Sequence, residues 1–144
     1  MTIPASSEVI VEANIQLHVT STFENRGKIS GEGTLIFSQN VDNRGKIFIK
    51  YLKGKTITNL PFSTMSCYDI QVDNIINRSV VNSVTTTLTC TNSYVGNVNN
   101  FYDAVFINHG TMKGNVTNWE IDAKFINHGN FEGRINSLIP GPYP

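Results

Sequence analysis

Apolar and polar residues alternate with a period of two over much of this chain. Between Val9 and Val19 apolar residues occupy every second position, and from Glu12 onward the residues between them are polar. This period is typical of a half-buried β-strand, because successive side chains of a strand point to opposite faces. The pattern predicts a strand over residues 9–19 that forms a first coil or a cap. The same alternation recurs at Ile29, Leu35, Phe37, Ile47 and Ile49.

Short segments of the sequence repeat at an interval of 18 or 19 residues. FENRGKI begins at Phe23 and VDNRGKI at Val41, whereas FINHGTMKGNV begins at Phe106 and FINHGNFEGRI at Phe125. The shared pattern is apolar-x-Asn-x-Gly-x-apolar. We expect the Gly to turn the chain with a positive φ, which costs glycine little. The repeats therefore predict a series of similar coils, each closed by a tight turn.

Asparagines continue this repeat through the middle of the chain. The intervals between successive anchors are 18, 16, 18, 15, 16 and 19 residues. In stacked coils, equivalent side chains lie about 4.8 Å apart, so each amide can donate to one neighbour and accept from the other. The spacing predicts one ladder of seven residues: Asn25, Asn43, Asn59, Asn77, Asn92, Asn108 and Asn127.

A repeat of this length suits one coil of a parallel β-solenoid and is too short for a helix–turn–helix unit or a propeller blade. Ile, Val and Thr total 42 residues against 10 Ala and Leu, which favours an all-β chain. We predict a single solenoid domain at 9–137 with about seven coils of 15–19 residues. Residues 1–8 are an N-terminal extension and 138–144 a Pro-rich tail. A right-handed coil is favoured, because the sequence lacks the six-residue period of left-handed coils.

Charge is scarce and balanced. The chain has 11 basic and 11 acidic residues, and 18 Asn supply much of the polarity. A neutral chain is not expected to bind nucleic acid by overall electrostatic attraction. No apolar run is long enough to span a bilayer, and no signal peptide is visible, so we expect no membrane insertion and favour a virion or cell-surface assembly. Cys67 and Cys90 are expected to be free thiols, although their pairing stays open.

One family resemblance stands out. GTLIFSQNVDNRGKI, preceded by FENRGKISGEGTL, resembles the repeats of filamentous-haemagglutinin-type adhesins and related autotransporter passengers. The match covers about residues 23–50 and 104–136. The resemblance implies a right-handed β-helix and an adhesin-like binding module.

Candidate chemistry is sparse. His109 and His128 occupy equivalent positions and could hold a divalent metal, but no third ligand recurs beside them, so exposed turn histidines are the favoured interpretation. Repeated cations could contact an anion or a sulfated glycan, although Glu24 and Asp42 repeat beside them and favour local ion pairs. These cations are Arg26, Arg44, Lys28 and Lys46. The acids do not converge on one point, so the sequence predicts no enzyme and no cofactor.

Three functions follow as hypotheses. The first is a non-enzymatic structural building block of a larger assembly, such as a virion shell, a surface appendage or a filament, whose partners are itself or other structural proteins. The second is an adhesin-like module that binds a glycan or receptor, and the third is a polysaccharide-active enzyme. Prolines in the tail cannot continue a strand ladder, so the tail either caps the end or docks on a neighbour. The contact residues would then be Leu138, Ile139 and Tyr143.

Overall fold

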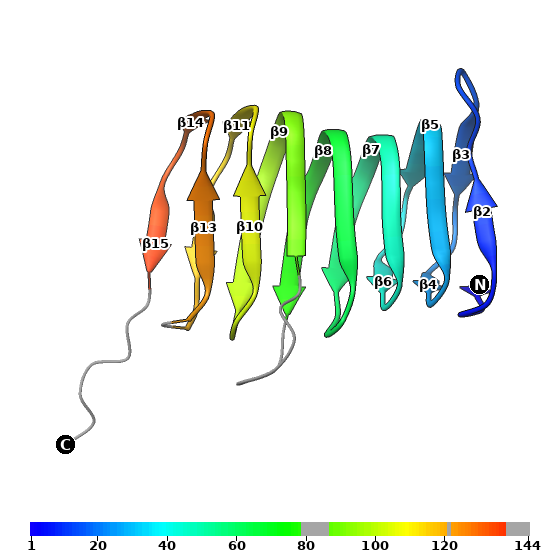
Figure 1. Cartoon of the computed structure of the whole chain (residues 1–144), viewed down its shortest axis with the longest axis horizontal. Helices are drawn as coiled ribbons and strands as arrows, with labels where there is room; N and C mark the ends of the chain where they lie inside the picture. Colours follow the sequence, from blue (N-terminus) through cyan, green and yellow to red (C-terminus); the bar gives the residue numbers. More distant parts are fainter. Residues whose placement is uncertain (79–86, 121, 138–144) are drawn as a thin grey trace.

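The computed structural model describes residues 1–78, 87–120 and 122–137 and contains only strands and turns in that part of the chain. Figure 1 shows the coils stacked side by side along one axis, with the N-terminal coil at one end and β15 at the other. No helix in the described residues could cross a membrane. The strands are β1 Thr2–Ile3, β2 Glu8–Ile10, β3 Gln16–Val19, β4 Phe23–Asn25, β5 Lys28–Phe37, β6 Val41–Asn43, β7 Lys46–Asn59, β8 Thr64–Arg78, β9 Thr87–Phe101, β10 Val105–Asn108, β11 Thr111–Lys113, β12 Val116–Asn118, β13 Lys124–Asn127, β14 Asn130–Glu132 and β15 Ile135–Ser137.

Parallel pairing between successive coils arranges these strands in three faces. Face 1 contains β1, β4, β6, β12 and β15 with the C-terminal ends of β7, β8 and β9. Face 2 contains β2, β10 and β13 with the N-terminal parts of β5, β7, β8 and β9. Face 3 contains β3, β11 and β14 with the remaining parts of the long strands. The all-β parallel solenoid of about seven coils is thereby confirmed, and its right-handedness stays a prediction.

The core consists of columns of equivalent side chains that stack from coil to coil. Alternation places every second residue inside, so each face contributes one continuous apolar column. Face 1 contributes Phe23, Val41, Ile57, Ile75, Val98 and Val116; face 2 contributes Ile29, Ile47, Met65, Leu88 and Phe106; and face 3 contributes Leu35, Leu52, Ile70, Tyr94 and Met112, all buried. Each buried Ile or Leu of this kind stabilises the fold by about 1.5–3 kcal/mol.

Coil length varies more than the sequence predicts. The register between Val41 and Ile57 corresponds to a 16-residue step, whereas that between Asp69 and Ser93 corresponds to 24 residues. The longest coil includes residues 79–86, outside the described part of the chain. The expected range of 15–19 residues was therefore too narrow. The columns nevertheless stay aligned, because most of the additional length lies between β8 and β9, and a register shift after Cys67 that adds one residue is reversed before Asn74.

The N-terminal coil also differs from its prediction. Residues 9–19 do not form one strand, because Asn14 adopts a left-handed φ of 66° and separates β2 from β3. Asn tolerates this conformation better than most residues. Residues 2–3, which the sequence assigned to an extension, form β1 and pair in parallel with β4.

The glycines of the Asn-x-Gly turns serve a different purpose from the predicted one. The described glycines with positive φ are Gly31, Gly96 and Gly114, and no turn glycine is among them. A Cβ on Gly45 would instead overlap the carbonyl oxygen of Gly27, and one on Gly129 would overlap that of Gly110. These turns need glycine because successive turns stack in backbone contact.

Candidate functional site

A buried asparagine ladder follows the last inward position of face 1. Asn25 Nδ2 donates to Asn43 Oδ1 at 2.8 Å, and Asn43 Nδ2 donates to Asn59 Oδ1 at 2.9 Å. Further along, the Nδ2 of Asn77 donates to Asn100 at 3.2 Å, and that of Asn100 donates to a sixth residue, Asn118, at 3.0 Å. Every bond is donated by the earlier coil to the later one. The predicted exchange of amide hydrogen bonds between coils is confirmed from Asn25 to Asn43 and from Asn43 to Asn59, whereas the steps through Asn100 and Asn118 were not predicted.

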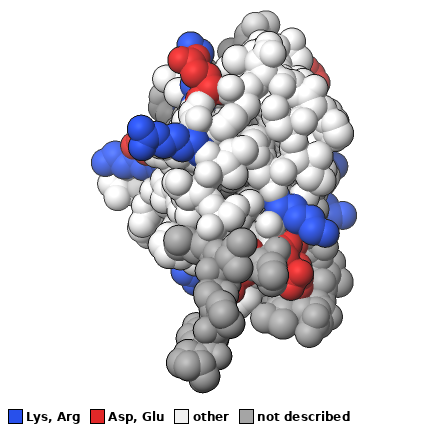
Figure 2. Space-filling view, turned by 90° about the vertical axis from the view of Figure 1, so that its left-hand side faces the viewer, with Lys and Arg blue, Asp and Glu red and all other residues white. Residues whose placement is uncertain are grey.

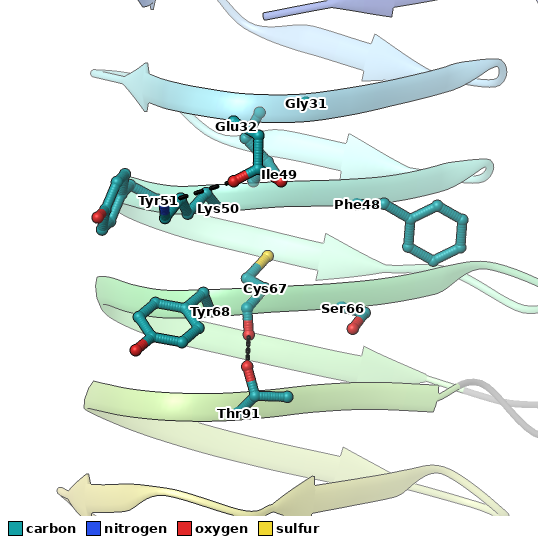
Figure 3. A pocket seen from close by; sticks show the side chains of 10 residues that line it. All are labelled: Gly31, Glu32, Phe48, Ile49, Lys50, Tyr51, Ser66, Cys67, Tyr68 and Thr91. Carbon is teal, nitrogen blue, oxygen red and sulfur yellow. Dashed lines mark hydrogen bonds and ion pairs between the residues drawn. The ribbon is translucent and has the colours of Figure 1, made fainter. Parts of the chain in front are cut away.

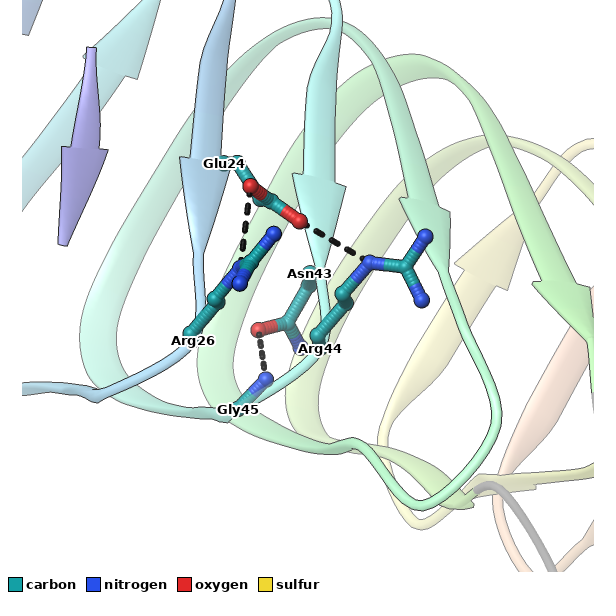
Figure 4. Close-up of polar contacts among 5 residues, drawn as sticks. All are labelled: Glu24, Arg26, Asn43, Arg44 and Gly45. Carbon is teal, nitrogen blue, oxygen red and sulfur yellow. Dashed lines mark hydrogen bonds and ion pairs between the residues drawn. The ribbon is translucent and has the colours of Figure 1, made fainter. Parts of the chain in front are cut away.

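The same amides also hold the turns that lead to face 2. Asn25 Nδ2 donates to Lys46 O at 3.2 Å, and Asn100 Nδ2 makes the equivalent bond to Lys124 O at 3.2 Å. Figure 4 shows Asn43 Oδ1 accepting from the backbone N–H of Gly45 at 3.3 Å. Backbone polar groups at a buried corner require partners, and Asn43 satisfies one in its own turn while Asn25 and Asn100 satisfy one in the neighbouring coil.

A second, shorter ladder lies in face 2. Asn108 Nδ2 donates to Asn127 Oδ1 at 2.8 Å, and both side chains accept from the glycine N–H two residues later. In the two coils before Asn108, the same column contains Cys67 and Cys90. Cys90 Sγ donates to Ser93 O at 3.2 Å, so a thiol stabilises this turn where the amide of Asn108 does so on the next coil.

The prediction of a single ladder of seven asparagines is therefore wrong, because these residues do not all lie in one column. Asn108 and Asn127 belong to a different face from Asn25, Asn43, Asn59 and Asn77. Asn92 belongs to neither ladder, because its side chain is exposed and donates to Asp69 at 2.7 Å. The sequence analysis missed Asn100 and Asn118, although each follows a Val by two residues as Asn43 does.

One step of the face 1 ladder lacks its hydrogen bond. Asn59 and Asn77 are register partners and both are fully buried. Asn59 Nδ2 and Asn77 Oδ1, the atoms that would bond at this step, have no hydrogen-bond partner. Beyond Asn59 the chain turns through Phe62, whose φ is 70°, in place of an Asn-x-Gly turn. Buried polar groups without partners cost about 1–3 kcal/mol each, so this step is the weakest in the ladder.

The repeated cations come together, but most of them contact carboxylates. Figure 4 shows Glu24 between Arg26 and Arg44, whose Nε atoms lie 3.1 and 2.9 Å from its oxygens. Lys28 Nζ lies 2.7 Å from Glu8. The predicted local pairing is confirmed at Glu24, whereas Lys28 pairs with Glu8, which was not predicted, and none of the ion pairs found among the described residues involves Asp42. The hydrogen bond from Arg26 lowers the pKa of Glu24, and that from Lys28 lowers the pKa of Glu8.

A shallow pocket of about 340 Å³ is lined by all four of these cations, namely Arg26, Lys28, Arg44 and Lys46, and by Phe62. Three of these cations contact two carboxylates, Glu24 and Glu8, so the four cations outnumber their carboxylate partners by two. An anion contact here stays a prediction.

The two repeated histidines stack on adjacent coils. The rings of His109 and His128 are 5.1 Å apart and inclined by 14°, and both residues are exposed. Within the described ranges, no three or more His, Cys, Asp or Glu side chains gather closely enough to hold a metal. The two residues are therefore stacked turn histidines. Each imidazole could offer one nitrogen to a metal ion, so the pair could supply two ligands at most.

A larger hollow of about 600 Å³ lies where face 2 meets face 3 (Figure 3). Its charged groups, Glu32 and Lys50, form an ion pair at 3.4 Å. Thr91 Oγ1 donates to Cys67 O at 3.4 Å, and Tyr68 lies exposed at the rim. Burial raises the pKa of the Cys67 thiol and so disfavours the reactive thiolate. The hollow therefore offers an apolar wall with one compensated charge pair.

A stacked aromatic pair, of exposed Trp119 and half-buried Phe101, was not anticipated from the sequence. The rings of Phe101 and Trp119 lie 5.6 Å apart with an interplanar angle of 2°, and the Arg78 guanidinium lies 5.3 Å from the Phe101 ring centre. Trp119 Nε1 donates to Asn99 Oδ1 at 3.1 Å. The signal was an aromatic residue directly after each of Asn100 and Asn118.

The predicted tail contacts Leu138, Ile139 and Tyr143 lie outside the described residues.

The ladders and apolar columns define the class of protein as a parallel β-solenoid repeat protein. No family model, curated protein or solved structure matches the chain, so the function has to be argued from its own residues.

Proposed function

We propose that this chain is a non-enzymatic structural protein, a stiff building block of a larger assembly such as a virion shell, a surface appendage or a filament. The observation that carries the proposal is that the polar contacts of the chain run along the axis of the solenoid. Its buried amides hydrogen-bond from coil to coil over most of the length of the rod. Side chains of this kind bind the coils together and do not converge on a common point.

The charged side chains also connect adjacent coils. Glu8 contacts Lys28 and Glu32 contacts Lys50, and in each pair the two residues belong to adjacent coils. Near the other end, Lys113 Nζ lies 3.0 Å from Glu132 on the next coil. Exposed pairs of this kind contribute little to the free energy of folding, but each one resists sliding of one coil over the next. Rigidity along one axis is the property that a building block requires.

The proposal is tested by measuring the mass and shape of the full chain from dilute to concentrated solution by light scattering and negative-stain electron microscopy. A building block gives particles larger than one chain, with repeating dimensions, either alone or with its structural partners. A rod that stays monomeric and joins no particle in the cells or virions that produce it would overturn the proposal.

An adhesin-like binding module is the second candidate, favoured by exposed Trp119, which stacks on Phe101. Aromatic side chains offer an apolar face with a polar edge, which suits a sugar ring. The test is a glycan array probed with the wild-type chain and with Trp119→Ala. Binding that disappears in the variant would support the adhesin-like function, and an empty array would contradict it.

A further inference from the structure

Within residues 1–78, 87–120 and 122–137, the strands at the two ends of the solenoid each have one edge without a partner strand. Among the described residues, β13, β14 and β15 pair only with the coil before them, and β1, β2 and β3 only with the coil after them. Ile135 is 53% exposed although it continues the buried column of Val98 and Val116. Such edges present unpaired N–H and C=O groups that can pair with a further strand.

The register of the paired strands predicts which residues would be adjacent if a second copy continued the stack of coils. On face 2, register partners connect Glu8 through Lys28 and Lys46 to Lys124 in the last coil. A further coil in the same register would place the second copy's Glu8 next to Lys124. On face 3, the column that starts at His18 ends at Glu132. That column would place the second copy's His18 next to Glu132.

Charge is complementary at the face 2 position, where Glu8 of the second copy would meet Lys124. Glu8 and Lys28 already form an ion pair at 2.7 Å in this column, so the geometry accommodates a carboxylate next to a lysine one coil away. Glu132 likewise accepts a cation from the preceding coil, since Lys113 lies 3.0 Å from it. Opposite charges directly across a strand pair are favourable, and like charges in that position are unfavourable.

The apolar surfaces of the two ends also match. Ile10 is 66% exposed and Ile126 is 37% exposed, and both occupy the same outward column of face 2. Inside, half-buried Val9 would cover half-buried Phe125, and Leu17 would cover Phe131 in the same manner. Figure 2, which views the C-terminal end, shows a largely uncharged surface with Lys, Arg, Asp and Glu side chains towards its margins.

We propose that a second copy of this chain docks head-to-tail, with its β2 and β3 adding in parallel to β13 and β14 of the first. This inference rests on the proposed structural function and specifies its interface. The two surfaces are different from each other, so the contact is heterologous and repeats to give an open filament instead of a closed dimer. Burial of the apolar columns supplies the attraction, while the charge pair between Glu8 and Lys124 selects the register.

The register is tested with Lys124→Glu in the full chain, compared with Lys46→Glu. Both lysines belong to the same column and are exposed, but only Lys124 lies at the end. Lys124→Glu should weaken self-association about fivefold at low ionic strength, and Lys46→Glu should leave it unchanged. Mixing Lys124→Glu with Glu8→Lys should restore association, because each end then meets an opposite charge. Equal effects of the two lysine variants, or no restoration, would overturn the register.

Direct contact is tested by thiol cross-linking between two differently tagged copies, Ile10→Cys in one and Ile126→Cys in the other. Register partners on parallel strands lie within the Cα separation that a disulfide accepts, so mild oxidation should join the two tags. The wild-type chain, with buried Cys67 and Cys90, is the control. Links only between identical copies, or none at all, would overturn head-to-tail docking. If light scattering still detects assemblies in that case, the building-block function stands and only this interface is wrong.

Discussion

Replacing Asn43 by alanine tests whether the ladder stabilises the fold. The fully buried Asn43 side chain accepts from Asn25 at 2.8 Å and donates to Asn59 at 2.9 Å. Each net hydrogen bond is worth about 1 kcal/mol, and a buried partner that loses its bond adds about 1–3 kcal/mol. Asn59 Nδ2 has no partner, and the substitution would leave Asn59 Oδ1 without its bond to Asn43. We therefore expect Asn43→Ala to lower the free energy of unfolding by about 3 kcal/mol.

Two other asparagines are matched controls. Asn92→Ala removes an exposed bond to Asp69 and should cost less than about 0.5 kcal/mol. Asn127 is exposed in the last coil, so Asn127→Ala should cost less than about 1.5 kcal/mol even though it removes the bond from Asn108. Comparing the losses of stability of the Asn43, Asn127 and Asn92 variants distinguishes the effect of the buried ladder from an effect common to any Asn→Ala substitution.

Urea unfolding followed by far-ultraviolet circular dichroism measures these differences, provided that the slope of the transition is unchanged among the variants. Repeat proteins can unfold in segments, so hydrogen exchange should locate the loosened region in the coils around β6. A loss below about 0.5 kcal/mol for Asn43→Ala, or a cost for Asn92→Ala as large as that of Asn43→Ala, would refute the reasoning.

Three more perturbations follow from the packing and the ionisation of the coils. Gly45→Ala should lower the free energy of unfolding by about 2–4 kcal/mol, because the added methyl group overlaps the backbone of the preceding coil. Thermal unfolding measures this loss, and a melting temperature like that of the wild type would contradict the close contact. Burial raises the pKa of Cys90 to about 11, while an unfolded thiol ionises from about pH 8.5, so stability should fall as pH rises between these values. Cys90→Ala should reduce that loss, and an unchanged pH profile of the urea midpoint would count against the buried thiol. Because Arg26 and Arg44 lower the pKa of Glu24, its contribution is present above the ordinary carboxyl pKa and is lost as pH falls below it. Glu24→Gln should flatten the acid side of the same profile, and a profile as steep as that of the wild type would argue against the ion pairs.

The sequence predicted the solenoid because its two strongest signals are physical requirements of that fold. Period-two alternation generates the inward columns, and an asparagine followed two residues later by glycine stabilises a corner where turns stack closely. Asn25, Asn43 and Asn108 could be found in this way. The motif identifies the kind of corner but not which corner, since the same turn chemistry closes face 1 at Asn43 and face 2 at Asn108. This ambiguity merged two ladders into one.

The position of Asn92 shows a second limit of the sequence analysis. With 18 asparagines in the chain, one lay near the expected interval by coincidence. The true step from Asn77 leads to Asn100, 23 residues on, because one coil is longer than the rest. Spacing alone cannot detect this, since the number of residues between two strands is not constrained by their pairing. Likewise the match between Lys124 and Glu8 requires the register of every intervening strand.

The longest coil has a consequence for how such a chain can change over time. Five additional residues separate Asn77 from Asn100 compared with the 18-residue step from Asn100 to Asn118, yet all three amides stay in one column. Length variation between β8 and β9 is thus uncoupled from the alignment of the rod. Insertions and deletions at a corner alter the outer surface without moving the core, because strand pairing fixes side-chain positions and connecting segments do not. A lineage of such proteins can therefore acquire new surface segments at its corners while the stacked columns stay the same.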